Sequence, residues 1–270
     1  MPSFEILCVT MDQYDFSKTR EMNIHSNVIF ANQCDHTAYD EMAFDGHTAK
    51  MISTNTRGVG INRNLALMYA SADICLFADD DIVYRDNMEQ LILSEFAAHP
   101  DADIFIFHLD TDDPVRKQIS YRKTKRCGLL SRMPWGGVRI AFRLDSIKKA
   151  NLWFTTLFGG GCIFSSGEDS IWLAEAKRKG LTFYVSSQTI GTVSFDTSSW
   201  FTGYDEKYFY GKGAYVYALH SHSFWLWKWY YLLRYRKAGN LPFFERSKWM
   251  ERGKLGYQQL MSYQVFCKGE

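Results

Sequence analysis

The sequence lacks several features that would assign it at once to a common class. Its six cysteines form no CxxC pair, and none lies near a histidine at zinc-binding spacing, which argues against a disulfide scaffold and for a reducing cytosol. The net charge is only +1, so we expect no nucleic-acid partner. No basic segment followed by an apolar stretch opens the chain, and we expect no secretion signal.

Charge is distributed unevenly along a chain that is long enough for a sizeable core. With 270 residues, 46% of them hydrophobic, the chain suffices for one α/β domain with or without an appendage. Residues 201–270 contain 11 Lys and Arg against 5 Asp and Glu, a balance of +6, so the preceding part balances at −5. An acidic body suggests a cation site, and a basic tail suggests an anionic surface as partner.

Short apolar runs alternate with segments of helical periodicity in the first part of the chain. The expected strands are 6–9, 27–31, 73–78, 103–109 and 181–185. The expected helices are 61–72, 88–96, 147–151 and 171–179. This alternation is typical of an α/β fold with a mostly parallel sheet covered by helices. Such sheets bind ligands beyond the carboxyl ends of their strands.

Three aspartates, Asp79, Asp80 and Asp81, follow directly on one of these expected strands. Carboxylates in this place hold a hard divalent cation and leave positions for phosphate oxygens. A nucleotide-sugar transferase needs this arrangement, because its leaving group is a diphosphate whose developing charge the cation neutralises. A second pair, Asp110 and Asp112, also follows a strand and remains a rival, although we favour Asp79 and Asp81.

A second group of carboxylates precedes an expected amphipathic helix. Gly167 is followed by Glu168 and Asp169, and the glycine triplet 159–161 lies shortly before them. Asp169 is a candidate general base that takes the proton from an acceptor hydroxyl. The glycines would let a substrate approach the backbone closely. The competing interpretation is a pair of first-turn carboxylates favoured by the helix dipole.

These motifs resemble glycosyltransferase family 2. That family has an Asn, a Gly and an Ala-Arg-Asn before a helix, then a strand that ends in a DxD motif, and segments 55–64 and 70–81 are similar to it. Segment 167–169, with its helix and Gly180, resembles the ED motif of the same family, and the resemblance extends over residues 4–190. It implies a GT-A fold and an inverting sugar transfer from a nucleotide diphosphate sugar, with a UDP-sugar favoured.

The resemblance assigns a metal site and catalytic groups to individual residues. Asp79 and Asp81 would bind Mg²⁺ or Mn²⁺, with Asp81 as the more direct ligand. Asp169 would be the catalytic base, and Glu168 would orient the acceptor or support the base. His222, in the C-terminal part of the chain, is a weaker candidate for a further metal ligand. The alternative interpretation is a polar residue on a loop.

The resemblance also implies contacts with the donor. Asp35, after the second strand, would match the aspartate that reads the uracil ring, and Thr10, at the end of the first strand, would line the base and ribose pocket. Arg63 would lie near the diphosphate, and Asp80 would contact the donor as well. The sequence departs from the family pattern at Asn62, which replaces the alanine before the arginine. No QxxRW motif follows, which argues against a processive polymer synthase.

We expect a GT-A catalytic domain over residues 1–200 and a helical extension over residues 201–270. The nucleotide-binding half of the domain would span about 1–110 and the acceptor half about 111–200. Within the extension, segment 224–233 is rich in Trp and Tyr and is followed by basic residues. It is too short to cross a bilayer, but aromatic rings next to cations favour an anionic membrane surface. The alternative is a helix packed on the domain.

The sequence therefore predicts a metal-dependent glycosyltransferase, acting on a glycan or polyprenyl-diphosphate-linked acceptor in cell-surface polysaccharide synthesis. We expect it in the cytoplasm, peripheral on the inner face of the plasma membrane. One alternative is a non-catalytic scaffold of a polysaccharide assembly complex. Another is a haloacid-dehalogenase-like phosphatase, whose DxDx(V/T) pattern segment 79–83 fits; against it, Leu173 stands where a second aspartate is needed.

Overall fold

The computed structural model describes residues 2–111, 121–128, 137–193 and 203–268. The chain forms two compact units. The first unit comprises Met1–Arg57, Ile61–Phe154 and Glu175–Thr197. The second comprises Gly58–Gly60, Thr155–Ala174 and Ser198–Glu270. Two segments from the middle of the chain thus belong with the C-terminal helices.

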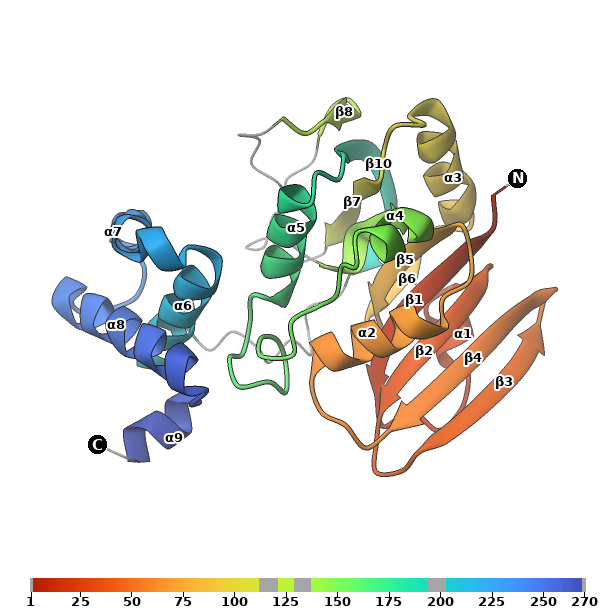
Figure 1. Ribbon diagram of the computed structural model, residues 1–270. Helices are drawn as coiled ribbons and strands as arrows, with labels where there is room; N and C mark the ends of the chain where they lie inside the picture. The colour runs from red at the N-terminus through yellow and green to blue at the C-terminus, as the bar shows by residue number, and fades with distance from the viewer. Residues whose placement is uncertain (1, 112–120, 129–136, 194–202, 269–270) are drawn as a thin grey trace. The chain divides into compact units, whose positions relative to one another are not determined.

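A mixed 10-stranded sheet forms the centre of the first unit, in the order β3-β4-β2-β1-β5-β9-β7-β10-β6 with β8 paired to β10 (Figure 1). The strands are β1 (Phe4–Met11), β2 (Asn27–Gln33), β3 (Ala38–Phe44), β4 (His47–Thr54), β5 (Ile74–Asp79), β6 (Ile82–Tyr84), β7 (Ile104–Thr111), β8 (Lys125–Arg126), β9 (Ile140–Arg143) and β10 (Phe183–Val193). Strands β4, β2, β1 and β5 run parallel, as do β7 and β10, whereas β9 runs antiparallel between β5 and β7. The expected α/β class, with a largely parallel sheet, is confirmed.

Helices cover both faces of this sheet. Their bounds are α1 (Lys18–Glu21), α2 (Val59–Tyr69), α3 (Met88–Ala98) and α4 (Leu144–Lys149), whereas the helix α5 (Glu168–Arg178) is divided between the two units. Because successive side chains of a strand point to opposite faces, Ile6 and Leu7 of β1 enter different layers. Ile6 packs in a cluster with Met22, next to α1, and Met88 of α3. On the other face Figure 1 shows α2 and α4.

The structure contains a hairpin, β3–β4, that the hydrophobic pattern did not predict. β3 lies at the edge of the sheet and is largely exposed, so it has no clean apolar alternation. The turn carries a signal nevertheless: Asp45 and Gly46 both have positive φ, 45° and 82°, between the paired residues Phe44 and His47. An Asp-Gly pair is preferred where a two-residue hairpin turn needs this conformation twice.

Other predicted elements occur close to their expected places. All five expected strands and all four expected helices are present with shifted ends. The predicted stop after α5 is confirmed, because Gly180 has a φ of 83°, as a glycine at the C′ position requires. β10 is longer than expected and continues to Val193 through irregular pairing with β7.

In the second unit, the described residues 203–268 form four α-helices. They are α6 (Glu206–Leu219), α7 (Phe224–Arg234), α8 (Phe243–Gln259) and α9 (Tyr263–Lys268), with a short 3-10 turn η2 (Ser221–Ser223) before α7. α6 and α8 cross at two glycines: a Cβ on Gly213 would lie 2.0 Å from the Met250 carbonyl oxygen, and one on Gly253 would lie 1.9 Å from that of Tyr210. Across the described segments, no helix is long and apolar enough to cross a membrane.

Candidate active site

Parallel strands bring three of the predicted site residues to one edge of the sheet. β1 lies between β2 and β5, with Val9 opposite Asp79 and Met11 opposite Gln33. Thr10, the last residue but one of β1, therefore lies beside Asp79, the last residue of β5, and Asp35 follows β2 at the same edge. This edge is the one at which open α/β sheets bind their ligands.

Arg63 and Asp79, predicted separately, form an ion pair. Arg63 Nη2 of α2 lies 3.0 Å from Asp79 Oδ1, and only 3% of the arginine side chain is exposed, against 38% of the aspartate. The Arg63 guanidinium also stands over the Phe154 ring, 5.3 Å from its centroid. A cation held in place by an aromatic ring and by packing fixes the orientation of the carboxylate that it faces. Asn62, the departure from the family pattern, donates to the Ala31 carbonyl oxygen of β2 at 3.2 Å and so fastens α2 to the sheet.

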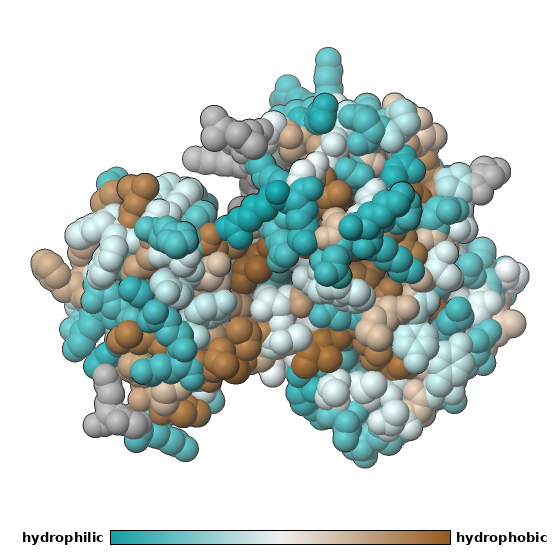
Figure 2. Space-filling view, viewed as in Figure 1, coloured by the Kyte–Doolittle hydropathy of each residue, from teal (hydrophilic) through white to brown (hydrophobic). Residues whose placement is uncertain are grey.

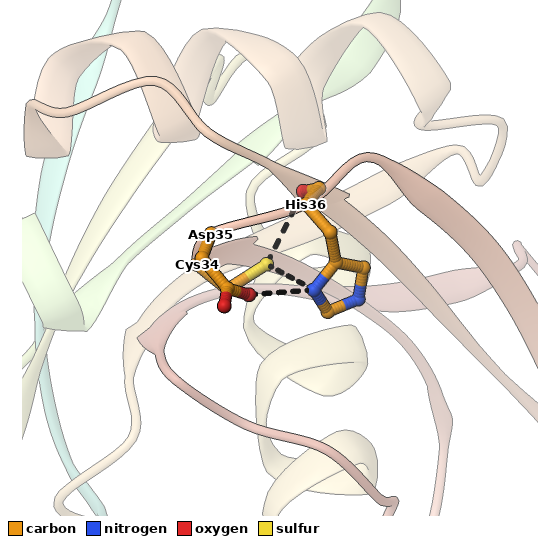
Figure 3. Close-up of side chains that lie close together, drawn as sticks. All are labelled: Cys34, Asp35 and His36. Atoms are coloured by element: carbon orange, nitrogen blue, oxygen red, sulfur yellow. Dashed lines mark hydrogen bonds and ion pairs between the residues drawn. The ribbon is translucent and has the colours of Figure 1, made fainter.

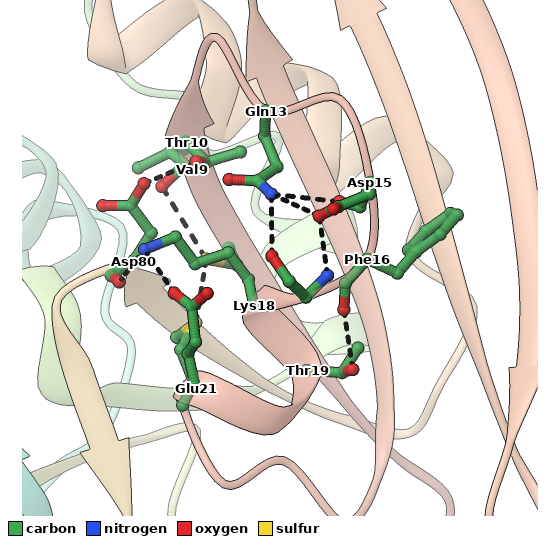
Figure 4. A network of polar contacts seen from close by, with 12 residues as sticks. Val9, Thr10, Gln13, Asp15, Phe16, Lys18, Thr19, Glu21 and Asp80 are labelled. Carbon is green, nitrogen blue, oxygen red and sulfur yellow. Dashed lines mark hydrogen bonds and ion pairs between the residues drawn. The ribbon is translucent and has the colours of Figure 1, made fainter.

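Asp80 is held from two sides (Figure 4). Thr10 Oγ1 donates to Asp80 Oδ2 at 2.5 Å, and Lys18 Nζ, which also pairs with Glu21 at 3.1 Å, lies 3.4 Å from the Asp80 carbonyl oxygen. Lys18 was not singled out from the sequence, because only the fold places α1 beside the end of β5. Its positive charge partly offsets the repulsion among the three aspartates.

Asp81 fits a cation ligand. Its Oδ1 is buried and, among the described residues, has no hydrogen-bond partner. Burial and then the charges of Asp79 and Asp80 raise the pKa of Asp81 to about 6. A buried carboxylate oxygen without a donor is costly to keep, and a divalent cation would satisfy it and relieve the repulsion. The donor set of closely spaced carboxylates suits the hard cations Mg²⁺ and Mn²⁺.

The rival pair is differently placed. Asp110 ends β7, and its carboxylate is paired with Arg85 Nη2 at 3.0 Å and with His108 Nε2 at 3.4 Å. Asp112 lies outside the described residues. Since two basic side chains already face Asp110, its surroundings fit an ion pair better than a cation site.

Asp35 lies in a small cluster with its two neighbours (Figure 3). His36 Nδ1 is 2.9 Å from Asp35 Oδ1 and 3.5 Å from Cys34 Sγ. The hydrogen bond to His36 is the main cause that lowers the pKa of Asp35, whose side chain is 82% exposed. The Tyr14 ring lies near-parallel to the His36 ring at 6.2 Å between centroids. The carboxylate is thus charged, accessible and flanked by flat rings.

Asn32 positions the loop between β1 and α1, and the sequence analysis missed it. The side chain is fully buried in β2, accepts from the Gln13 backbone N–H at 3.1 Å and donates to the Gln13 carbonyl at 2.7 Å. It also donates to Ser53 Oγ of β4 at 3.0 Å. The sequence signal for this role was an asparagine directly after the apolar run 28–31, because a buried amide must find hydrogen-bond partners.

The second unit carries Glu168 and Asp169 at the start of α5. Glu168 Oε2 accepts from the Gly167 N–H at 3.1 Å. Gly159 has a φ of 111°, and a Cβ there would lie 2.4 Å from Val59 and 3.1 Å from the Glu168 carboxyl. Only glycine fits this position, because a side chain would collide with Val59 and Glu168, and the close approach of a substrate to the glycine triplet stays a prediction.

The family pattern of "Glycosyl transferase family 2" matches residues 27–165, just over half of the chain. The chain belongs to glycosyltransferase family 2. The matched segment contains β2, α2 and β5 with the three aspartates, and it ends before Glu168 and Asp169. Glycosyl transfer is therefore its class of activity, whereas the role of the ED segment in this family member stays a prediction.

Solved structures of glycosyltransferases share the fold. Residues 1–349 of TarS from S. aureus, also crystallised in complex with UDP-GlcNAc, are 15% identical to the chain, with a TM-score of 0.58 over 97% of this chain and 93% of that one. The mannosyltransferase PcManGT from Pyrobaculum calidifontis, in complex with GDP-Man and Mn²⁺, is 12% identical, with a TM-score of 0.52 over 95% and 87%. At these identities the likeness is one of fold, which is GT-A. No curated protein matches the chain in sequence.

His222 lies on the exposed turn η2 in the second unit of this family member. The aspartates that would bind a metal belong to the first unit, and so His222 as a metal ligand stays a prediction. The same holds for Asp169 and Glu168 as partners of a donor bound at the end of β5. The structure thus groups Thr10, Arg63 and the three aspartates, with Asp35 at the same edge of the sheet.

Proposed function

We propose that the protein transfers a sugar, with inversion, from a UDP-sugar to a hydroxyl of a glycan or lipid-linked acceptor in cell-surface polysaccharide synthesis. The binding of a nucleotide-sugar donor is supported above all by the end of β5. There a buried oxygen of Asp81 has no hydrogen-bond partner among the described residues, and the neighbouring Asp79 is held in place by its ion pair with Arg63. The crystallised complexes of TarS with UDP-GlcNAc and of PcManGT with GDP-Man and Mn²⁺ support a nucleotide-sugar donor.

On the donor side, each residue at the sheet edge has a distinct task. Asp79 and Asp81 would hold Mg²⁺ or Mn²⁺, which neutralises charge on the departing diphosphate. Arg63 keeps the Asp79 carboxylate in one orientation, and Thr10 does the same for Asp80. The exposed Asp35 would accept hydrogen bonds from the base, since a charged carboxylate is a strong acceptor.

On the acceptor side, Asp169 would take the proton from the attacking hydroxyl. A carboxylate within hydrogen-bond reach of a nucleophile contributes about 10²–10⁴-fold to the rate. Glu168, whose carboxylate accepts from the Gly167 N–H, would orient the acceptor or the base. A single displacement by this hydroxyl, opposite the leaving diphosphate, inverts the anomeric carbon.

The surface of α7 supports a location at the membrane. Its inward residues are Phe224, Lys228 and Leu232, whereas its outward face exposes large apolar side chains: Trp225, Leu226, Trp229, Tyr230 and Leu233. Phe244, at the start of α8, is 83% exposed. Figure 2 shows brown hydrophobic patches among teal ones over these C-terminal helices. Aromatic rings beside Arg and Lys fit the headgroup layer of an anionic leaflet, so we place the enzyme peripherally on the inner face of the plasma membrane.

The decisive experiment is thermal unfolding of the purified protein with UDP, GDP and dTDP, each with and without Mn²⁺. A ligand that binds only the folded state raises the melting temperature by mass action. We expect a Mn²⁺-dependent rise with UDP that Asp81→Ala abolishes and Asp110→Ala, its control, retains. A rise with GDP alone would replace the uridine assignment, and no rise with any nucleotide would favour the scaffold alternative. Membership in the family removes the phosphatase alternative.

A further inference from the structure

A cage of tyrosine rings encloses Lys212 within the second unit. Tyr208, Lys212 and Tyr215 follow one another at helical spacing along one face of α6. Lys212 Nζ lies 5.5 Å, 4.6 Å and 5.5 Å from the ring centroids of Tyr208, Tyr215 and Tyr231, the last on α7. Rings at these distances attract a cation, and more strongly where water is excluded.

Lys212 has no counter-ion in the part of the chain that the structure describes: it forms neither an ion pair nor a hydrogen bond there. Lys228 of α7 shows the contrast. Its ammonium is also covered by aromatic rings, but it pairs with Glu251 at 2.5 Å and donates to Ser247 at 2.9 Å. A buried charge is ordinarily paired in this way. Lys228 thus has a carboxylate partner, whereas Lys212 and Lys254, whose ammonium also lies near three rings, have none among the described residues.

The charges around Lys212 strengthen the need for an anion. Burial, and then the positive charge of Arg234, lower the pKa of Lys212 to about 8. Two nearby carboxylates are engaged elsewhere: Asp205 caps α6 by accepting from the Tyr208 N–H, and Glu206 accepts from the Tyr263 hydroxyl. The site is therefore a local excess of positive charge lined by flat, partly polar rings.

This cage adjoins the loop that carries the proposed base. A Cβ on Gly167 would lie 2.8 Å from Tyr215 Cδ2, so the ring packs directly on the residue before Glu168. The Tyr215 hydroxyl also interacts with Ser170, the residue after Asp169. All of these residues belong to the second unit. A ligand group held at Lys212 would lie on the acceptor side.

We propose that Lys212, with Tyr208, Tyr215 and Tyr231, forms an acceptor subsite that binds a phosphate group. The inference rests on the proposed function, in which Asp169 deprotonates the acceptor. It narrows the acceptor to one that carries a phosphomonoester, phosphodiester or diphosphate near the reacting hydroxyl. The ammonium supplies the charge, and the tyrosine rings and hydroxyls supply the walls, so a neutral sugar acceptor would leave the lysine without its partner.

The test is calorimetric titration of the full chain with inorganic phosphate, after UDP and Mn²⁺ have been added to saturation so that the donor's own phosphate contacts are occupied. We expect saturable binding to the wild type that weakens roughly tenfold or more in Lys212→Met. Lys207→Met, at an exposed lysine of the same helix, is the matched control and should bind as the wild type does. Wild-type protein with no saturable phosphate binding, or Lys212→Met with unchanged affinity, would overturn the proposal.

Two further measurements keep the result interpretable. If Lys212→Met does not fold, Tyr231→Leu removes one wall of the cage and leaves the charge, and we expect a smaller loss of phosphate affinity. Farnesyl diphosphate and glycerol phosphate, titrated separately, distinguish a lipid-linked source of the phosphate from a water-soluble one. Failure of UDP and Mn²⁺ to bind the wild type would count against the proposed donor site, whereas loss of phosphate binding in Lys212→Met alone concerns this inference.

Discussion

Arg63 and Asp79 form an ion pair in which the arginine is almost wholly buried and the carboxylate reaches the surface. The arginine comes from α2 and the aspartate from the end of β5, and Phe154 covers the guanidinium. The pair therefore links the packing of a helix to the orientation of a proposed metal ligand. A change at Arg63 should affect both stability and donor binding.

Arg63→Met should lower the free energy of unfolding by about 1–3 kcal/mol, because it leaves Asp79 facing two other carboxylates without its cation. It should also weaken UDP binding in the presence of Mn²⁺. Urea unfolding measures the first effect and calorimetry the second. The control is Arg85→Met, which breaks an ion pair with Asp110 whose side chains are both about half exposed. Such a pair contributes about 1 kcal/mol or less, and equal losses in the two variants would contradict the special role of Arg63.

Asp81→Asn should raise the melting temperature of the metal-free protein. The substitution removes a buried negative charge next to Asp79 and Asp80 and gives the site an amide that can donate. The same variant should lose the Mn²⁺-dependent rise with UDP. Asp110→Asn serves as the control, because it should leave that rise unchanged. A destabilised Asp81→Asn protein would mean that the carboxylate is already satisfied without a metal.

Asp169→Asn should lower turnover by roughly 10²-fold or more while UDP and Mn²⁺ still bind. The amide keeps the size of the side chain but accepts no proton. Single-turnover sugar transfer gives the rate, and the melting temperature confirms folding. Glu175→Gln, two turns along α5 in a weak ion pair with Lys179 at 3.7 Å, should keep near-normal turnover. Similar rates in both variants would remove Asp169 from the catalytic role.

Trp225→Ala combined with Trp229→Ala should release the protein from liposomes that contain an anionic lipid. Both rings lie on the outward face of α7, about half exposed, so their removal should not disturb the core. Flotation with anionic and with purely zwitterionic vesicles measures the binding. Trp153→Ala, at an exposed tryptophan of the first unit, should float as the wild type does. Unchanged flotation of the double variant would assign α7 a purely structural role.

The stability of the wild type should rise with pH between about 8 and 10.5 by an increment that Lys212→Met lacks. The folded-state pKa of Lys212 is lowered to about 8 from 10.5, so the unfolded chain binds more protons within this window. Burial raises the pKa of Tyr208, Tyr215 and Tyr231, so near and above about pH 10 these groups lower the stability. They are present in both proteins, as is the charged Arg234, so the difference between the two pH profiles reports Lys212. Urea unfolding of both proteins at about pH 7 and about pH 9.5 gives the difference. Parallel pH profiles would mean that Lys212 titrates normally.

Elements with strong local patterns could be predicted from the sequence. Apolar runs and helical periodicity located β1, β2, β5 and α3, and the place of three aspartates directly after an apolar strand located the edge at which we propose that the donor binds. Gly180 ended α5 as expected, because a positive φ is a local requirement. The hairpin β3–β4 was not predicted, because an exposed edge strand has no alternating apolar pattern. The pair Asp45-Gly46, which is typical of a two-residue hairpin turn, was the available signal.

What only the tertiary structure decided are the partners of the polar and charged side chains. The sequence determined that Arg63, Asp79, Lys212 and Lys228 exist at helical or strand-end positions, but no local rule states which cation faces a carboxylate. Packing of α2 on the sheet brings Arg63 into an ion pair with Asp79, and packing of α7 beside α8 brings Lys228 into an ion pair with Glu251. The same packing of α6 and α7 left Lys212 among tyrosine rings. Hydrophobic periodicity is a property of neighbouring residues. Charge pairing depends on segments that are distant in sequence and come together only when the core packs.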